Sequence, residues 1–179
     1  MALKTKFLII IGMQNDFITG TLGTPDAQEI IPRIKDKLKY SEDGQTSVIF
    51  IKDTHFDNYL NTLEGKLNPV PHCIVNTPGY EIISELNTHK ARVLTKHTFA
   101  DRFFAEELAD CYNLDINTIE IELCGVRTDV CVVSMALMLR SFLPNIKIKV
   151  DSKCCAGTTP KKHKAALEVM KSCQIEIQK

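Results

Sequence analysis

The sequence lacks a net charge and any hydrophobic run long enough to cross a bilayer. Its 22 basic residues balance 22 acidic ones, and the pI is near 6.9. This balance argues against a surface that follows nucleic-acid phosphates or binds anionic lipid. The first apolar run, residues 7–11, is too short for a transmembrane helix or a signal-peptide core. We therefore expect a cytoplasmic protein with no membrane or nucleic-acid partner.

Two kinds of sequence motif are also missing. The seven cysteines are odd in number and form no Cys-x-x-Cys pair, which excludes a zinc ribbon and argues against a secreted disulfide framework. Neither GxGxxG nor GxxxxGK[ST] occurs, so no glycine loop that cradles phosphate is expected. The 179 residues are 44% hydrophobic, which fits one domain over residues 1–179 with a sizeable core.

What the chain does contain is an alternation of apolar strands and amphipathic helices. Uninterrupted apolar residues at 7–11 predict a strand buried on both faces, as in a parallel sheet. Further strands are predicted at residues 47–52, 92–96, 118–124, 147–151 and 174–177. Helices are predicted from Asp26 as cap to about Tyr40 with a kink or restart at Pro32, and at residues 81–87, 101–111, 129–143 and 160–172.

This order of elements predicts an α/β fold: a doubly wound, mostly parallel six-stranded sheet with helices on both faces. Residues 53–79 show no clear periodicity, and aperiodic segments of that length inside compact domains are usually functional. In such sheets, ligands bind beyond the carboxyl ends of the strands. Reactive side chains at those ends therefore indicate the site.

A cysteine and a lysine follow two of these strands. Cys131 is expected in the first turn of the helix after the fourth strand, where amide groups and the helix dipole favour a thiolate. The backbone N–H groups of Arg127 and Cys131 would bind the oxyanion of a tetrahedral intermediate. The alternative is a buried structural cysteine. Lys96 is either a solvent-exposed strand end or a neighbour that lowers the pKa of the thiol.

A metal site is suggested by the second strand end. Asp53 and His55 flank one residue, so in extended backbone both side chains point the same way as two ligands of a mixed nitrogen–oxygen site. The alternative is a hydrogen-bonded loop motif. His72, whose backbone is stiffened by the prolines at 69 and 71, and Glu64 are the candidates for further ligands.

Several ordered motifs together resemble the isochorismatase-like cysteine hydrolases, especially their nicotinamidase branch. The resemblance covers nearly the whole chain. It is carried by MQNDF at 13–17, DTH at 53–55, EGK-L-P-PHC at 64–73 with TPG at 77–79, the lysine after the third strand, GVRTDVCV at 125–132 and DSKCCAGTTPKKH at 151–163.

The resemblance implies an activity: hydrolysis of a small amide, such as nicotinamide, to an acid and ammonia through a thioester. It implies Cys131 as nucleophile and Lys96 as the lysine of the triad. The implied ligands of zinc, iron or manganese are Asp53, His55, His72 and Glu64. Phe17, Phe99 and Val126 would lie at the substrate, although Phe17 and Phe99 are equally compatible with the core. It also implies a cis peptide between Val126 and Arg127 and a homo-oligomer.

One position departs from the family pattern. The family places its general-base aspartate directly before the MQNDF-type segment, where this chain has Gly12. Three explanations remain open: a substitution made to trap a complex, a natural member without turnover, or a member that uses another base or water. If the missing carboxylate alone limits the rate, Gly12→Asp should raise amide hydrolysis sharply.

Two other functions stay open at this point. One is a non-catalytic module that binds a small amide or carboxylate. The other is hydrolysis of a different amide or of an isochorismate-like substrate. Arg127 stands where the family often has a smaller residue, and it either narrows the pocket, binds a carboxylate or points to solvent.

Overall fold

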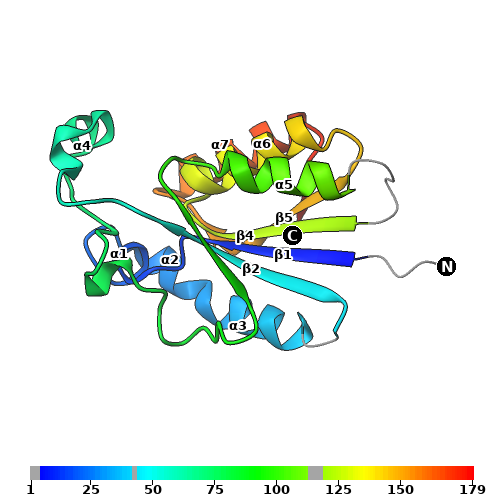
Figure 1. Ribbon diagram of the computed structural model, residues 1–179, viewed down its shortest axis with the longest axis horizontal. Helices are drawn as coiled ribbons and strands as arrows, with labels where there is room; N and C mark the ends of the chain where they lie inside the picture. Colours follow the sequence, from blue (N-terminus) through cyan, green and yellow to red (C-terminus); the bar gives the residue numbers. More distant parts are fainter. Residues whose placement is uncertain (1–4, 42–43, 113–118) are drawn as a thin grey trace.

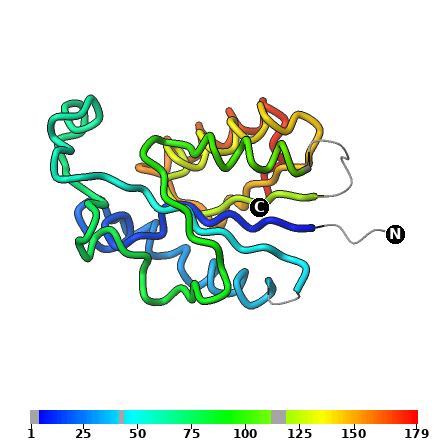
Figure 2. The backbone as a smooth tube through the Cα atoms, in the orientation of Figure 1, coloured from blue at the N-terminus to red at the C-terminus, as the bar shows by residue number. Residues whose placement is uncertain are grey.

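A six-stranded sheet in which every pair of neighbouring strands is parallel forms the centre of the molecule (Figures 1 and 2). The computed structural model describes residues 5–41, 44–112 and 119–179. The strands are β1 (Thr5–Ile11), β2 (Thr46–Asp53), β3 (Arg92–Lys96), β4 (Ile119–Val126), β5 (Lys147–Ala156) and β6 (Glu176–Gln178). Their order across the sheet is β3-β2-β1-β4-β5-β6.

Helices cover both faces of this sheet. The helices are α1 (Asn15–Ile18), α2 (Pro25–Glu29), α3 (Ile31–Tyr40), α4 (Leu63–Leu67), α5 (Arg102–Tyr112), α6 (Val133–Phe142) and α7 (Pro160–Ser172). Figure 1 shows α5, α6 and α7 on one face and α2 and α3 on the other. The predicted doubly wound α/β fold is therefore confirmed.

The core is built around β1. Residues 7–11 are all buried, and β1 pairs with β2 on one side and β4 on the other. Ile9 lies opposite Ile49 of β2 and Leu123 of β4, and all three are at most 3% exposed. Burial on both faces explains why this strand has no polar alternation.

The helix expected over residues 26–40 is two helices, α2 and α3. The cap of α2 is Thr24 rather than Asp26, because the Thr24 side chain accepts a hydrogen bond from the Ala27 N–H. Asp26 lies two positions further on, in the first turn, where a carboxylate complements the helix dipole. The restart expected at Pro32 is present, since Pro32 lies in the first turn of α3.

The prediction of a short helix at residues 81–87 is wrong. This segment instead runs against the chain that leaves β1: Ile82 forms an antiparallel bridge with Gln14, and the Ile83 N–H donates to the Met13 carbonyl at 3.0 Å. The backbone groups are therefore satisfied by a distant partner, which local sequence pattern does not reveal.

Two further boundaries matter for the site. The helix expected at 129–143 begins as a π-helical turn, η4 (Thr128–Val132), and continues as α6. The aperiodic segment at 53–79 contains the short turns η2 (Tyr59–Asn61) and η3 (Pro78–Tyr80) on either side of α4. Figure 1 shows α4 standing away from the body of the sheet. Among the described residues, no helix is long and apolar enough to cross a membrane.

Candidate active site and metal centre

The carboxyl ends of three strands bring together a carboxylate, an ammonium group and a thiol. Asp53 ends β2, Lys96 ends β3, and Cys131 lies in η4 just after β4. Lys96 is 3% exposed, so it is not the solvent-exposed strand end that was the alternative. Its Nζ lies 2.9 Å from Asp53 Oδ1. This contact is a buried ion pair.

The charge of Lys96 acts directly on Cys131. Burial opposes the ammonium charge, yet the neighbouring Cys131 and Asp53 outweigh it and raise the pKa of Lys96, which is therefore protonated at neutral pH. Burial and the neighbouring Asp53 raise the pKa of the Cys131 thiol, while Lys96 and the Arg127 backbone lower it. Lys96 therefore acts in the expected direction, but burial outweighs it and the thiol pKa is raised overall.

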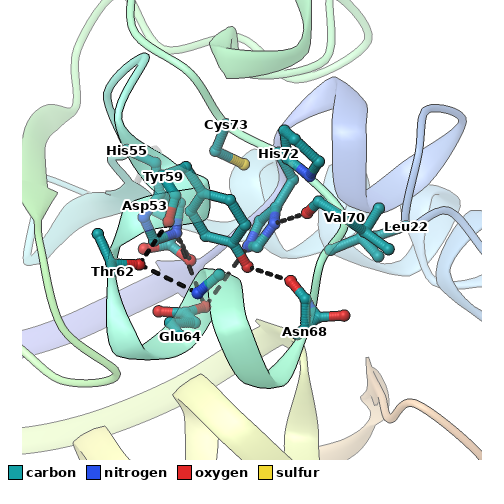
Figure 3. Close-up of polar contacts among 12 residues, drawn as sticks. Leu22, Asp53, His55, Tyr59, Thr62, Glu64, Asn68, Val70, His72 and Cys73 are labelled. Atoms are coloured by element: carbon teal, nitrogen blue, oxygen red, sulfur yellow. Dashed lines mark hydrogen bonds and ion pairs between the residues drawn. The ribbon is translucent and has the colours of Figure 1, made fainter.

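Four side chains form a cluster beside this pair (Figure 3). His55 Nε2 lies 3.6 Å from Asp53 Oδ2 and 3.8 Å from Glu64 Oε1, and His72 Nε2 lies 3.7 Å from the same Glu64 oxygen. Donor atoms of Asp53, His55 and His72 all lie within 4.8 Å of one another. Nitrogen and oxygen donors at this spacing suit a divalent ion.

The hydrogen bonding of the two imidazoles fits a bound cation. His72 Nδ1 lies 2.8 Å from the Val70 carbonyl, to which it must donate, so its Nε2 lone pair faces the cluster. His55 Nε2 is buried and has no hydrogen-bond partner in the described structure. Burial opposes ionisation of Asp53, but His55 and Lys96 lower its pKa to about 2. These three residues are thus arranged as ligands.

Tyr59 packs against both imidazoles, which the sequence did not suggest. Its ring lies edge-on to His55 at 4.8 Å and to His72 at 5.1 Å between centroids. The Tyr59 hydroxyl donates to the Asn68 carbonyl at 2.9 Å, as Figure 3 shows. Tyr59 therefore fixes the orientation of both rings.

Gln14 holds the backbone of Asp53 from both sides. Its Nε2 donates to the Asp53 carbonyl at 2.9 Å, and its Oε1 accepts from the Asp53 N–H at 2.6 Å. A second Nε2 hydrogen bond reaches the Tyr80 carbonyl at 2.8 Å. Gln14 is fully buried and acts as a positioning residue for the metal cluster. Its place three residues beyond the carboxyl end of β1 is the sequence signal for this role.

The nearby carboxylate Asp16, in α1, forms a hydrogen bond with the segment that returns from α4. Its Oδ2 accepts from the Cys73 N–H at 2.8 Å, so it ties the loop that carries His72 to α1. Asp16 is therefore an anchor for the metal loop.

Gly12 adopts a backbone conformation that excludes a side chain. Its φ is +66°, and a Cβ atom at this position would lie 2.3 Å from the Val126 carbonyl oxygen. An aspartate would therefore require the Val126 peptide to move. The expectation that Gly12→Asp alone raises activity is not supported by this geometry. The bond between Val126 and Arg127 is cis, as the family resemblance implied.

A cavity of about 340 Å³ opens beside Cys131. Its wall includes Phe17, which is buried, and Phe99, which is half exposed. This volume lies at the small end of the range for ligand pockets, roughly 300–1,000 Å³. Val126 is 1% exposed, belongs to the hydrophobic core, and is not one of the residues that line this cavity.

His163, a half-buried residue of α7, contacts the turn that carries Cys131. Its Nδ1 lies 2.8 Å from the hydroxyl of Thr128, the fully buried first residue of η4. The DSKCCAGTTPKKH segment is thus joined to the cysteine turn by a hydrogen bond.

These features define a class of protein: a doubly wound α/β protein with a cysteine–lysine pair beside a carboxylate–imidazole cluster. The chain belongs to the isochorismatase domain family, whose model matches residues 6–179.

Known relatives are consistent with this family. Nicotinamidase of Saccharomyces cerevisiae is 25% identical, covering 74% of this chain and 80% of the relative. Nicotinamidase of Schizosaccharomyces pombe is 27% identical, covering 95% and 91%. Pyrazinamidase of Pyrococcus horikoshii, solved in complex with zinc, superposes with a TM-score of 0.79 at 26% identity and covers 97% of this chain and 99% of that one.

Proposed function

We propose that this protein is a cysteine amidase that hydrolyses a small amide, such as nicotinamide, to the carboxylic acid and ammonia. The observation that carries the proposal is that Cys131 lines one small cavity together with the candidate metal ligands Asp53, Glu64 and His72, while Lys96 lies 2.9 Å from Asp53 behind it. The nicotinamidase and pyrazinamidase relatives support an amide as substrate.

The reaction would proceed in two stages. The sulfur of Cys131 attacks the amide carbon, and the backbone N–H groups of Arg127 and Cys131 stabilise the oxyanion that forms. The carbon–nitrogen bond then breaks, the thiol proton leaves with the nitrogen as ammonia, and a thioester remains. Water attacks the thioester carbon, which releases the acid and returns the proton to Cys131.

Lys96 would stabilise negative charge on the sulfur during attack. Its ammonium is buried and protonated next to Cys131, so it favours the thiolate as the proton departs. Gly12 offers no carboxylate to carry that proton. Loss of a positioned proton-transfer group typically lowers a rate by ~10²–10⁴-fold, so we expect slow turnover.

Asp53, His55, Glu64 and His72 would hold a divalent ion: zinc, iron or manganese. Such an ion supplies Lewis-acid coordination for a ring nitrogen of the substrate and for water. The first attack on the amide remains the task of Cys131.

The test is ammonia release from nicotinamide by protein supplied with zinc, iron or manganese. Slow but measurable release is expected, and Cys131→Ala should abolish it. Cys111→Ala is the matched control, because Cys111 is an exposed cysteine in α5 away from the cavity. Turnover that persists in Cys131→Ala would rule out the cysteine mechanism.

Gly12 favours one second candidate: a non-catalytic member that binds a small amide or carboxylate in the same cavity. This function predicts thermal stabilisation by nicotinamide or nicotinate without product, in the natural chain as well as in Cys131→Ala. Product formation that Cys131→Ala abolishes would eliminate it.

A further inference from the structure

Arg127 presents a partly buried guanidinium group at the cavity wall. Its Nη2 donates to the Leu22 carbonyl at 2.9 Å, and the guanidinium carbon lies 5.6 Å from the centre of the Phe17 ring. A guanidinium carries five N–H donors, and this contact uses one of them. The remaining N–H donors belong to a side chain that the Leu22 carbonyl and the Phe17 ring hold in place.

No carboxylate neutralises this group within the described parts of the chain. None of the ion pairs closer than 4 Å there involves Arg127 or the neighbouring Lys162, which lines the same cavity. The nearest candidate, Asp129, accepts hydrogen bonds from both the N–H and the hydroxyl of Thr158. Burial lowers the pKa of Arg127 against the opposing effect of Asp129. A buried charge without a partner is unfavourable.

The cavity presents both candidate metal ligands and a cation. Glu64, His72 and Arg127 all line it. The Phe17 ring lies 5.4 Å from the His72 ring between centroids, and the Arg127 guanidinium carbon lies 5.6 Å from the Phe17 ring centre. A flat molecule lying against Phe17 would therefore be close to both the metal ligands and the cation.

We propose that Arg127, assisted by Lys162, binds a carboxylate of the substrate, so that this site prefers an amide carrying a second, anionic group. The inference rests on the proposed function, because it names the class of amide taken by the same cavity. The planar guanidinium matches a carboxylate through two parallel hydrogen bonds, and Lys162 adds positive charge at the solvent side. A neutral amide would leave these donors without a partner.

The experiment compares three amides that share the ring nitrogen and the scissile group. They are nicotinamide, 5-carbamoylpyridine-3-carboxylate and its neutral isostere 5-nitropyridine-3-carboxamide. The carboxylate should give a kcat/KM about 10–100-fold above that of the isostere, since hydrogen bonds to charged groups are worth about 1.5–3 kcal/mol. Equal values for the two would overturn the proposal.

Variants separate charge recognition from support of the backbone. Arg127→Gln should reduce the preference for the carboxylate about 10–100-fold, mainly through KM, and Lys162→Gln should reduce it less. Lys161→Gln, an exposed control with the same change of charge, should leave the preference and the activity unchanged. If Arg127 only anchors Leu22, then Arg127→Gln will lower activity on all three amides alike and the proposal fails.

A binding measurement makes the result independent of turnover. Calorimetry with Cys131→Ala should show tighter binding of the carboxylate than of the isostere, and Arg127→Gln in the same background should remove the difference. Preferential binding without turnover in the natural chain would support the anionic subsite and contradict the amidase. Turnover without any preference would contradict the subsite and leave the amidase in place.

Discussion

Position 12 illustrates how strongly one residue depends on its neighbour across the sheet. Gly12 combines a positive φ of +66° with a Val126 carbonyl 2.3 Å from the place where a Cβ would stand. The positive φ alone disfavours other residues by about 1–2 kcal/mol. The close contact with the backbone adds to that cost, because a carbonyl in β4 cannot rotate away as a flexible side chain can.

This geometry predicts that Gly12→Ala destabilises the fold by more than about 2 kcal/mol. Gly44→Ala is the matched control, because Gly44 also has a positive φ, of +73°, but nothing lies within 4 Å of the added Cβ. Urea unfolding of both variants measures the difference. Equal losses at the two positions would show that the Val126 carbonyl moves aside freely.

At the same scale, the sequence identified the reactive side chains but not the residues that orient them. Asp53, Lys96 and Cys131 were predicted because each follows a recognisable strand, and parallel strands end at one edge. Tyr59 and Gln14 were not, because their roles depend on contacts across loops. Such contacts have no local pattern.

At the scale of elements, a partly buried ion cluster joins α3 to the sheet. Lys37 of α3 pairs with Glu122 of β4 and with Asp151 of β5, the latter at 2.6 Å. Burial raises the pKa of the Asp151 carboxyl, but Lys37 outweighs burial and the pKa is lowered overall. Ionised Asp151 therefore stabilises the native state.

Asp151→Asn should lower the free energy of unfolding at pH 7 by about 1–3 kcal/mol. Because the native pKa lies below the ordinary value of 3.8, the wild-type advantage is complete above that value. It disappears as the pH falls through the lowered pKa. The free energies of unfolding of the wild type and of Asp151→Asn, measured from pH 7 to pH 2, should therefore converge at low pH. Glu176→Gln, in the exposed pair with Lys147, should show little effect throughout.

Elements were predictable where local chemistry determines them. The buried apolar runs gave the strands, and Thr159-Pro160 gave the start of α7, where the Thr159 side chain accepts from the Lys162 N–H. The helix expected at residues 81–87 was wrong because its backbone bonds to the chain after β1. The π-helical turn at Cys131 has no recognised sequence signal.

At the scale of the whole molecule, the metal cluster links a projecting part to the body. Asp53 ends β2 of the central sheet and His55 comes two residues later. Glu64 lies on α4, and His72 lies on the loop that returns from α4. Figure 1 shows that α4 otherwise stands clear of the sheet. A divalent ion held by these residues would fasten α4 to the sheet edge.

We therefore expect zinc to raise the melting temperature and to protect residues 56–71 from proteolysis. A free zinc concentration of 100 times Kd adds about 2.7 kcal/mol to the free energy of unfolding. His72→Ala should abolish the zinc-dependent shift, while His89→Ala, at an exposed histidine outside the cluster, should retain it. A shift that survives in His72→Ala would mean that zinc binds elsewhere.

The conflict between Gly12 and the Val126 carbonyl also constrains how the chain can change over generations. Restoring an acidic residue at position 12 requires a coordinated alteration in a segment more than a hundred positions away. A change at position 12 or at position 126 alone would meet a backbone that fits the present residue at the other position.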